Sequence, residues 1–197
     1  MGDSITRLRL TQTHHSITFV RPNPLVLTAD DLRPIMALRN LRCIDLNLGW
    51  NVDLTDTDLL ELMSAWPHLG HLLINEVWGW QTFSGITPDG LVHLLQMCQS
   101  LRQLSVAIDT RGYTSLPRMR SPAHLGVDLS PSFSINVVDS VIDAASEPAL
   151  ATFFANLVPS ARCSLRAWSS WVFTWRTDKE VYARATEAVA RRSVVSA

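Results

Sequence analysis

The stretch Leu41–Leu46, LRCIDL, has apolar residues at its first, fourth and sixth positions. The spacing recurs in five more stretches, although polar residues open the last two. The six are ITRLRL from Ile5, LRCIDL from Leu41, LGHLLI from Leu69, LRQLSV from Leu101, SFSINV from Ser132 and RCSLRA from Arg162. Their starts lie 28 to 36 residues apart. Such a period is typical of solenoids, in which each unit buries its apolar side chains against its neighbours.

The pattern L-x-x-L-x-L is the strand segment of a leucine-rich repeat. We therefore predict an α/β fold, a leucine-rich-repeat solenoid with a curved parallel sheet and helices on its convex side. The repeat starts run from residue 5 to residue 162 without a linker, which indicates a single domain over residues 1–197 with about six units.

Helix starts follow the strand segments at regular places. Thr28 and Thr55 each precede an acidic residue by three positions, a spacing typical of a capping box. Pro34 lies a few residues beyond Thr28, so the first helix should start late or be kinked. Thr87 precedes Pro88, which predicts a helix with proline at its first position.

The later part of the chain is less regular. Residues 146–148 (SEP) predict another helix start, whereas proline and glycine between Asp109 and Ser132 predict an irregular loop. Residues 178–192, DKEVYARATEAVARR, contain good helix formers without a breaker and predict a closing helix.

Alternate residues of a strand face opposite sides of a sheet, so the polar positions between the apolar ones should form a concave face. The partner-binding candidates on that face are Asp45, Asn47, His71, Asn75, Gln103, Asn136 and Arg166. Trp50, Trp78 and Trp171 occupy equivalent positions in their units and should lie on one loop edge. Tryptophan is enriched at binding hot spots, so this edge is a second candidate. The alternative is that each ring packs beneath its own loop.

Composition disfavours several partners and locations. The chain has 17 basic and 18 acidic residues and a net charge of −1, which gives no general attraction to nucleic acid or anionic membranes. No apolar run approaches the roughly 20 residues that span a bilayer, and Met1–Leu10 does not resemble a signal peptide. Three cysteines without a C-x-x-C pair favour an intracellular protein, cytoplasmic or nuclear.

Catalytic and metal-binding patterns are missing from the sequence. It contains no G-x-S-x-G, H-E-x-x-H, P-loop or G-x-G-x-x-G motif, and His14–His15 has no further ligand at a suitable spacing. Asp45, His71 and Ser105 lie on successive predicted strands, but a chance arrangement explains them more simply. We predict no enzyme activity, no cofactor and no metal, with an enzyme on the concave face as an outside alternative.

Several segments together resemble the repeat region of fungal F-box proteins, especially those of mushroom-forming fungi. They are residues 38–50, 66–80, 85–109, 135–140, 147–161 and 165–171. The resemblance implies repeats that present a substrate and an F-box module that binds a Skp-type adaptor of a cullin ubiquitin ligase. No L-P-x-E-type segment precedes Ile5, so a Skp-type adaptor is expected only if an F-box lies upstream.

The expected function is therefore a protein-binding scaffold that resembles the substrate-recognition region of an F-box ubiquitin-ligase adaptor. A repeat fragment or truncated gene product with no specific ligand is the alternative. Ile5, Leu8 and Leu10 begin the first strand with only four residues before them. We expect this uncapped edge to favour self-association.

Overall fold

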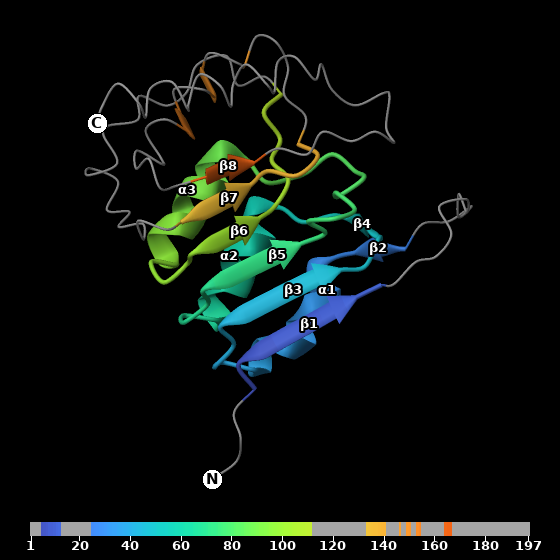
Figure 1. The fold of residues 1–197 in the computed structure, drawn as a ribbon, viewed down its shortest axis with the longest axis vertical. Helices are drawn as coiled ribbons and strands as arrows, with labels where there is room; N and C mark the ends of the chain where they lie inside the picture. Colours follow the sequence, from blue (N-terminus) through green and yellow to red (C-terminus); the bar gives the residue numbers. More distant parts are fainter. Residues whose placement is uncertain are drawn as a thin grey trace.

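The computed structural model describes residues 5–12, 25–111, 133–140, 146, 149–150, 153–154 and 164–166. Six strands form one parallel sheet in the order β1-β3-β5-β6-β7-β8 (Figure 1). Their bounds are β1 Arg7–Thr11, β3 Cys43–Asn47, β5 His71–Ile74, β6 Gln103–Ser105, β7 Ser134–Asn136 and β8 Ser164–Arg166. Each strand begins at the third position of one of the six recurring stretches, which confirms the predicted strand positions, their order and the α/β class.

The strand register places equivalent residues of successive units side by side. The fourth positions of the stretches form one row across the sheet, which runs Leu8, Ile44, Leu72, Leu104, Ile135 and Leu165. Ile44, Leu72 and Leu104 are buried, whereas Leu8 on the end strand is only partly buried. The repeated apolar spacing therefore produces one continuous core row, because each unit covers the apolar side chain of the next.

Helices cover one face of this sheet (Figure 1). Their bounds are α1 Ala29–Leu32, the 3₁₀ helix η1 Arg33–Ala37, α2 Asp56–Ala65 and α3 Pro88–Met97. The chain changes from α to 3₁₀ geometry at Arg33, next to Pro34, whose missing N–H cannot continue the α-helical hydrogen bonds. The first helix therefore starts at Ala29 and is interrupted rather than delayed.

Both predicted capping boxes are present. Asp58 Oδ2 accepts the Thr55 N–H at 2.9 Å, and Thr55 Oγ1 accepts the Asp58 N–H at 3.3 Å. At α1, Asp31 Oδ2 accepts the backbone and the hydroxyl of Thr28, each at 2.9 Å. These two bonds lower the pKa of the Asp31 carboxyl, the backbone bond having the larger effect.

A second, two-stranded parallel sheet joins β2 Val26–Leu27 to β4 Asn51–Val52. It lies beyond the carboxyl ends of β1 and β3 (Figure 1). Other predictions lie outside the described residues. They include the closing helix 178–192, Trp171, His14–His15 and nearly all of the irregular loop after Asp109. Among the described residues, no helix has the length and hydrophobicity needed to cross a bilayer.

Candidate functional site

The face of the six-stranded sheet opposite the core row carries the candidate binding residues. We call it the polar face, and its described side chains are Arg7, Arg9, Thr11, Cys43, Asp45, Asn47, His71, Leu73, Gln103, Ser105, Ser134 and Asn136. The register places Cys43, His71 and Gln103 side by side on adjacent strands, and all three are partly exposed. The sequence prediction thus holds for the grouping of His71 and Gln103. Arg166 lies in β8 beside Asn136, but its side chain is outside the described set.

An ion pair joins the first two strands on the polar face. Arg9 Nε lies 2.8 Å from Asp45 Oδ2, and the Arg9 side chain is 70% exposed. Asn47 Nδ2 donates to Asp45 Oδ1 at 2.7 Å, while Asn47 Oδ1 accepts the backbone N–H of Val77 at 3.0 Å. Asp45 and Asn47 are themselves buried, so they hold Arg9 and the next loop in place rather than facing solvent.

His71 and Gln103 form the central contact of the polar face. His71 Nδ1 lies 3.3 Å from Gln103 Oε1. A carboxamide oxygen only accepts hydrogen bonds, so in this arrangement Nδ1 is the donor of the contact. The pair therefore offers a partner the Gln103 amide NH2 as a donor, held at the centre of the polar face.

Asn136 extends this polar contact set to β7. Its Nδ2 donates to Glu76 Oε1 at 3.3 Å, and its Oδ1 accepts the Val138 N–H at 3.0 Å. Glu76 follows β5, so this bond spans the intervening strand β6. Glu76 was not singled out from the sequence, because it lies in a loop whose path the periodicity does not define.

The spacing of the stretches predicts that Asn75 is exposed on the polar face, but in the structure it is not. Its side chain is completely buried. Oδ1 accepts the Leu48 N–H at 3.0 Å, and Nδ2 donates to the Trp50 carbonyl at 2.7 Å. The backbone of Asn75 has a φ of 50°, so the chain leaves the strand there and the side chain turns inward to the preceding loop.

The loop edge holds two of the predicted tryptophans. Trp50 and Trp78 are both partly buried, and Trp50 packs against the core. A Cβ atom on Gly49 would lie 3.5 Å from the Trp78 ring, so this indole rests over the glycine backbone. Trp80, by contrast, is fully buried and donates its indole N–H to the Ile74 carbonyl at 3.1 Å. Trp50 and Trp78 are therefore less completely covered than Trp80.

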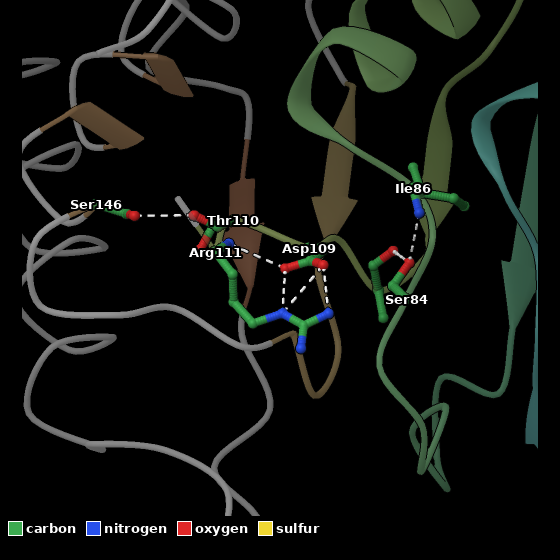
Figure 2. Close-up of polar contacts among 7 residues, drawn as sticks. Ser84, Ile86, Asp109, Thr110, Arg111 and Ser146 are labelled. Carbon is green, nitrogen blue, oxygen red and sulfur yellow. Dashed lines mark hydrogen bonds and ion pairs between the residues drawn. The ribbon is translucent and has the colours of Figure 1, made fainter. Parts of the chain in front are cut away.

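A second contact cluster lies where the chain leaves β6 (Figure 2). The Arg111 guanidinium forms a forked ion pair with Asp109, with Nε 2.9 Å from Oδ1 and Nη2 2.7 Å from Oδ2. The hydrogen bonds from Arg111 are the main cause of a lowered pKa of the Asp109 carboxyl. Arg111 also lies 4.1 Å above the Phe83 ring, a cation–π geometry. The sequence did not indicate this cluster, because Phe83 and Arg111 belong to different units.

Two serine hydroxyls near this cluster also bond to backbone groups (Figure 2). Ser84 Oγ donates to the Ala107 carbonyl at 2.8 Å and accepts the Ile86 N–H at 3.0 Å. Ser146 Oγ donates to the Thr110 carbonyl at 2.9 Å. These buried bonds hold the backbone of Ala107 and Thr110, the residues on either side of Ile108 and Asp109, in place.

Asp45, His71 and Ser105 do not form a catalytic triad. Asp45 contacts Arg9 and Asn47, and His71 contacts Gln103. Ser105 is buried, and its hydroxyl has no hydrogen-bond partner. Within the described residues, no group of three His, Cys, Asp or Glu side chains could hold a metal ion.

The described cysteines differ in their surroundings. Cys43 is partly exposed on the polar face, whereas Cys98 is buried and burial raises the pKa of its thiol to about 11. Cys163 lies outside the described residues. Comparison of the chain with protein-family models, curated proteins and solved structures finds no match.

Proposed function

We propose that this chain is a leucine-rich-repeat scaffold, an α/β solenoid that binds a protein partner on its polar face. The observation that carries the proposal is the set of partly exposed side chains Cys43, His71, Gln103, Ser134 and Asn136 on adjacent in-register strands. No described helix covers this face (Figure 1). A rigid sheet with short polar side chains offers many fixed donors and acceptors, which suits recognition of a protein surface.

The size of the polar face indicates that the partner also contacts the loop edge. Six strands about 4.8 Å apart span roughly 24 Å, and strands of three to five residues are about 10–16 Å long. This footprint of a few hundred Å² is smaller than the roughly 800 Å² that each partner buries in a typical stable complex. We therefore include the partly exposed residues Trp50 and Trp78 in the proposed interface, as aromatic anchors.

The resemblance to fungal F-box repeats suggests the most specific version of this proposal. A protein bound on the polar face would be a substrate recruited to a ubiquitin ligase in the cytoplasm or nucleus. Binding of a Skp-type adaptor would require an F-box module joined to these repeats. The proposal involves no catalytic step and no cofactor.

Affinity capture with two matched variants tests the proposal. His71→Glu introduces a charge at the centre of the polar face, while His93→Glu makes the same change on the exposed side of α3. Extracts of the organism that encodes the chain would be passed over the wild type and both variants, and retained proteins quantified by mass spectrometry. A buried unpaired charge at an interface typically costs about 2 kcal/mol or more, a loss of at least about thirtyfold.

The proposal predicts a protein that the wild type and His93→Glu retain equally and that His71→Glu loses. Equal retention by both variants would place binding elsewhere. If no protein is retained more strongly by the wild type than by a column without the chain, the result would favour a repeat protein with no specific ligand.

A further inference from the structure

The outer edge of β1 carries unpaired backbone groups in the described part of the chain. β1 is the end strand of the sheet order and pairs with β3 alone (Figure 1). The Thr6 carbonyl accepts the Arg42 N–H at 2.7 Å, and the Gln12 N–H donates to the Asn47 carbonyl at 2.7 Å. The backbone groups of Thr6 and Gln12, at the two ends of β1, therefore point toward β3. Successive residues of a strand point their backbone groups to opposite sides. Arg7, Arg9 and Thr11 therefore direct their N–H and C=O groups to the open edge.

Exposed apolar side chains accompany this open edge. Ile5 is 53% exposed and Leu10 46%, and in the second sheet Leu25 is 49% and Val26 43% exposed. β2 likewise pairs with β4 alone, so the first unit ends both sheets. Proteins usually cover or blunt such an edge, because it is a ready template for another strand.

The charge on β1 identifies which strand fits. Arg7 and Arg9 are both exposed on the polar side of β1, with Leu8 and Leu10 on the other side. On the inner edge, β3 places Asp45 beside Arg9 and the apolar residues Ile44 and Leu46 beside the two leucines. A strand added at the open edge would lie beside the same alternating arginine and leucine side chains of β1. It would therefore need acidic residues beside Arg7 and Arg9 and apolar residues beside Leu8 and Leu10.

We propose that the open edge of β1 binds an extended segment of another protein in which acidic and β-branched apolar residues alternate. The segment would extend the sheet by one strand, with its carboxylates near Arg7 and Arg9 and its apolar side chains over Ile5, Leu10 and Val26. This surface is distinct from the polar face of the proposed function.

A second copy of this chain, the occupant expected from the sequence, fits the edge less well than an acidic strand. Two β1 strands paired antiparallel about Arg9 set Arg9 against Arg9, and pairing about Leu8 sets Arg7 against Arg9. Pairing about Leu10 avoids these contacts but leaves Arg7 outside the paired strand. Like charges directly opposite one another destabilise a strand pair. An acidic strand makes the opposite contacts, so we commit to it.

Peptide binding to the full chain tests the proposal. The probe is a short, capped, fluorescent peptide that alternates valine with aspartate or glutamate, and the control peptide has lysine in place of each acid. Arg7→Glu reverses one edge charge, and Thr11→Pro removes one outward N–H while leaving the bonds to β3. Arg102→Glu is the matched control, since Arg102 is exposed just before β6, in the interior of the sheet order.

The proposal predicts that the acidic peptide binds and the lysine peptide binds at least about tenfold more weakly. Arg7→Glu and Thr11→Pro should each weaken binding by roughly fivefold or more, and Arg102→Glu should not. Hydrogen exchange should slow at the amides of Arg7, Arg9 and Thr11 when the peptide binds. Equal binding of both peptides, or full binding by Thr11→Pro, would overturn the proposal. A dimer in sedimentation that Thr11→Pro dissociates would overturn it too, because a second copy would then be the occupant.

Discussion

Asp139 accepts a hydrogen bond at 2.7 Å from the backbone N–H of Trp80, although 59 residues separate them in the sequence. Its second carboxylate oxygen accepts the N–H of Gln81 at 2.9 Å. Asp139 follows β7 and Trp80 follows β5, so the contact spans the intervening strand β6. The loop edge is therefore connected across units by a buried acid, in addition to the sheet between them.

We predict that Asp139→Ala destabilises the fold by about 2–3 kcal/mol, because the buried N–H of Trp80 and the partly buried N–H of Gln81 lose their acceptor. Gly79→Ala should also destabilise it, since the new Cβ would lie 2.6 Å from Asp139 Cγ and Gly79 has a φ of 71°. Urea unfolding measures both effects. In the Asp139→Ala background, Gly79→Ala should lower the free energy of unfolding by clearly less than it does in the wild type. If the two losses in free energy simply add, the contact between Gly79 and Asp139 is contradicted.

Asn75 is predicted to support stability rather than partner binding. Asn75→Ala leaves the Leu48 N–H and the Trp50 carbonyl without their buried partner, so we expect a loss of about 2–3 kcal/mol in the free energy of unfolding. Gln103→Ala on the partly exposed polar face is the control and should change stability by less than about 0.5 kcal/mol. Thermal unfolding of both variants measures this, and equal stabilities would refute the assigned role of Asn75.

At Gly90 in α3, we predict that a glycine-to-alanine change has the opposite of its usual effect on stability. Alanine normally favours a helix over glycine by about 1 kcal/mol. Here the added Cβ would lie 1.8 Å from Asp56 Oδ1, whose carboxylate accepts the Thr87 N–H at 2.8 Å and the Thr87 hydroxyl at 2.7 Å. Gly90→Ala should therefore destabilise the fold. In an Asp56→Ala background the same change should be neutral or stabilising, and a stabilising effect in the wild type would contradict the packing.

The Asp109–Arg111 pair predicts a pH dependence of stability. Because Arg111 lowers the pKa of Asp109 below its ordinary value of 3.8, the pair contributes fully above that value. Its contribution is lost as pH falls through the lower, folded-state pKa. Asp109→Asn should cost about 0.5 kcal/mol at neutral pH, since the pair is partly exposed.

Urea unfolding of wild type and Asp109→Asn at neutral pH and at about pH 3 measures this dependence. The difference between them should shrink in acid, because the carboxyl of the unfolded wild type takes up a proton near its ordinary pKa of 3.8, before the folded carboxyl does. Arg111→Gln should show the same reduced pH dependence as Asp109→Asn. A difference that is unchanged or larger in acid would mean that the pair does not lower the pKa of Asp109.

The strands were predictable because they follow from one local rule. An apolar residue at the first, fourth and sixth positions specifies a short strand with one buried face, and a near-constant period aligns equivalent residues. The ion pair between Arg9 and Asp45 follows from the same rule, since both residues occupy the fifth position of their stretches.

The loop contacts were not predictable in this way. Asn75 occupies a position that periodicity assigns to the polar face, but the strand ends before it and its positive φ turns the side chain inward. Trp80 and Asp139 meet across two units, which depends on the path of the loops rather than on any spacing within a unit. Local patterns therefore describe the sheet, whereas the loop edge depends on contacts between distant residues.

Hydroxyl-radical footprinting of the chain with its captured partner tests the central claim, that the polar face and loop edge bind a protein. His71, Trp50 and Trp78 report on that surface, while His93 and the 49% exposed Met97 report on α3. We predict that partner binding slows oxidation of His71, Trp50 and Trp78 and leaves His93 and Met97 unchanged. Protection of His93 and Met97 with unchanged oxidation of His71 would contradict the claim.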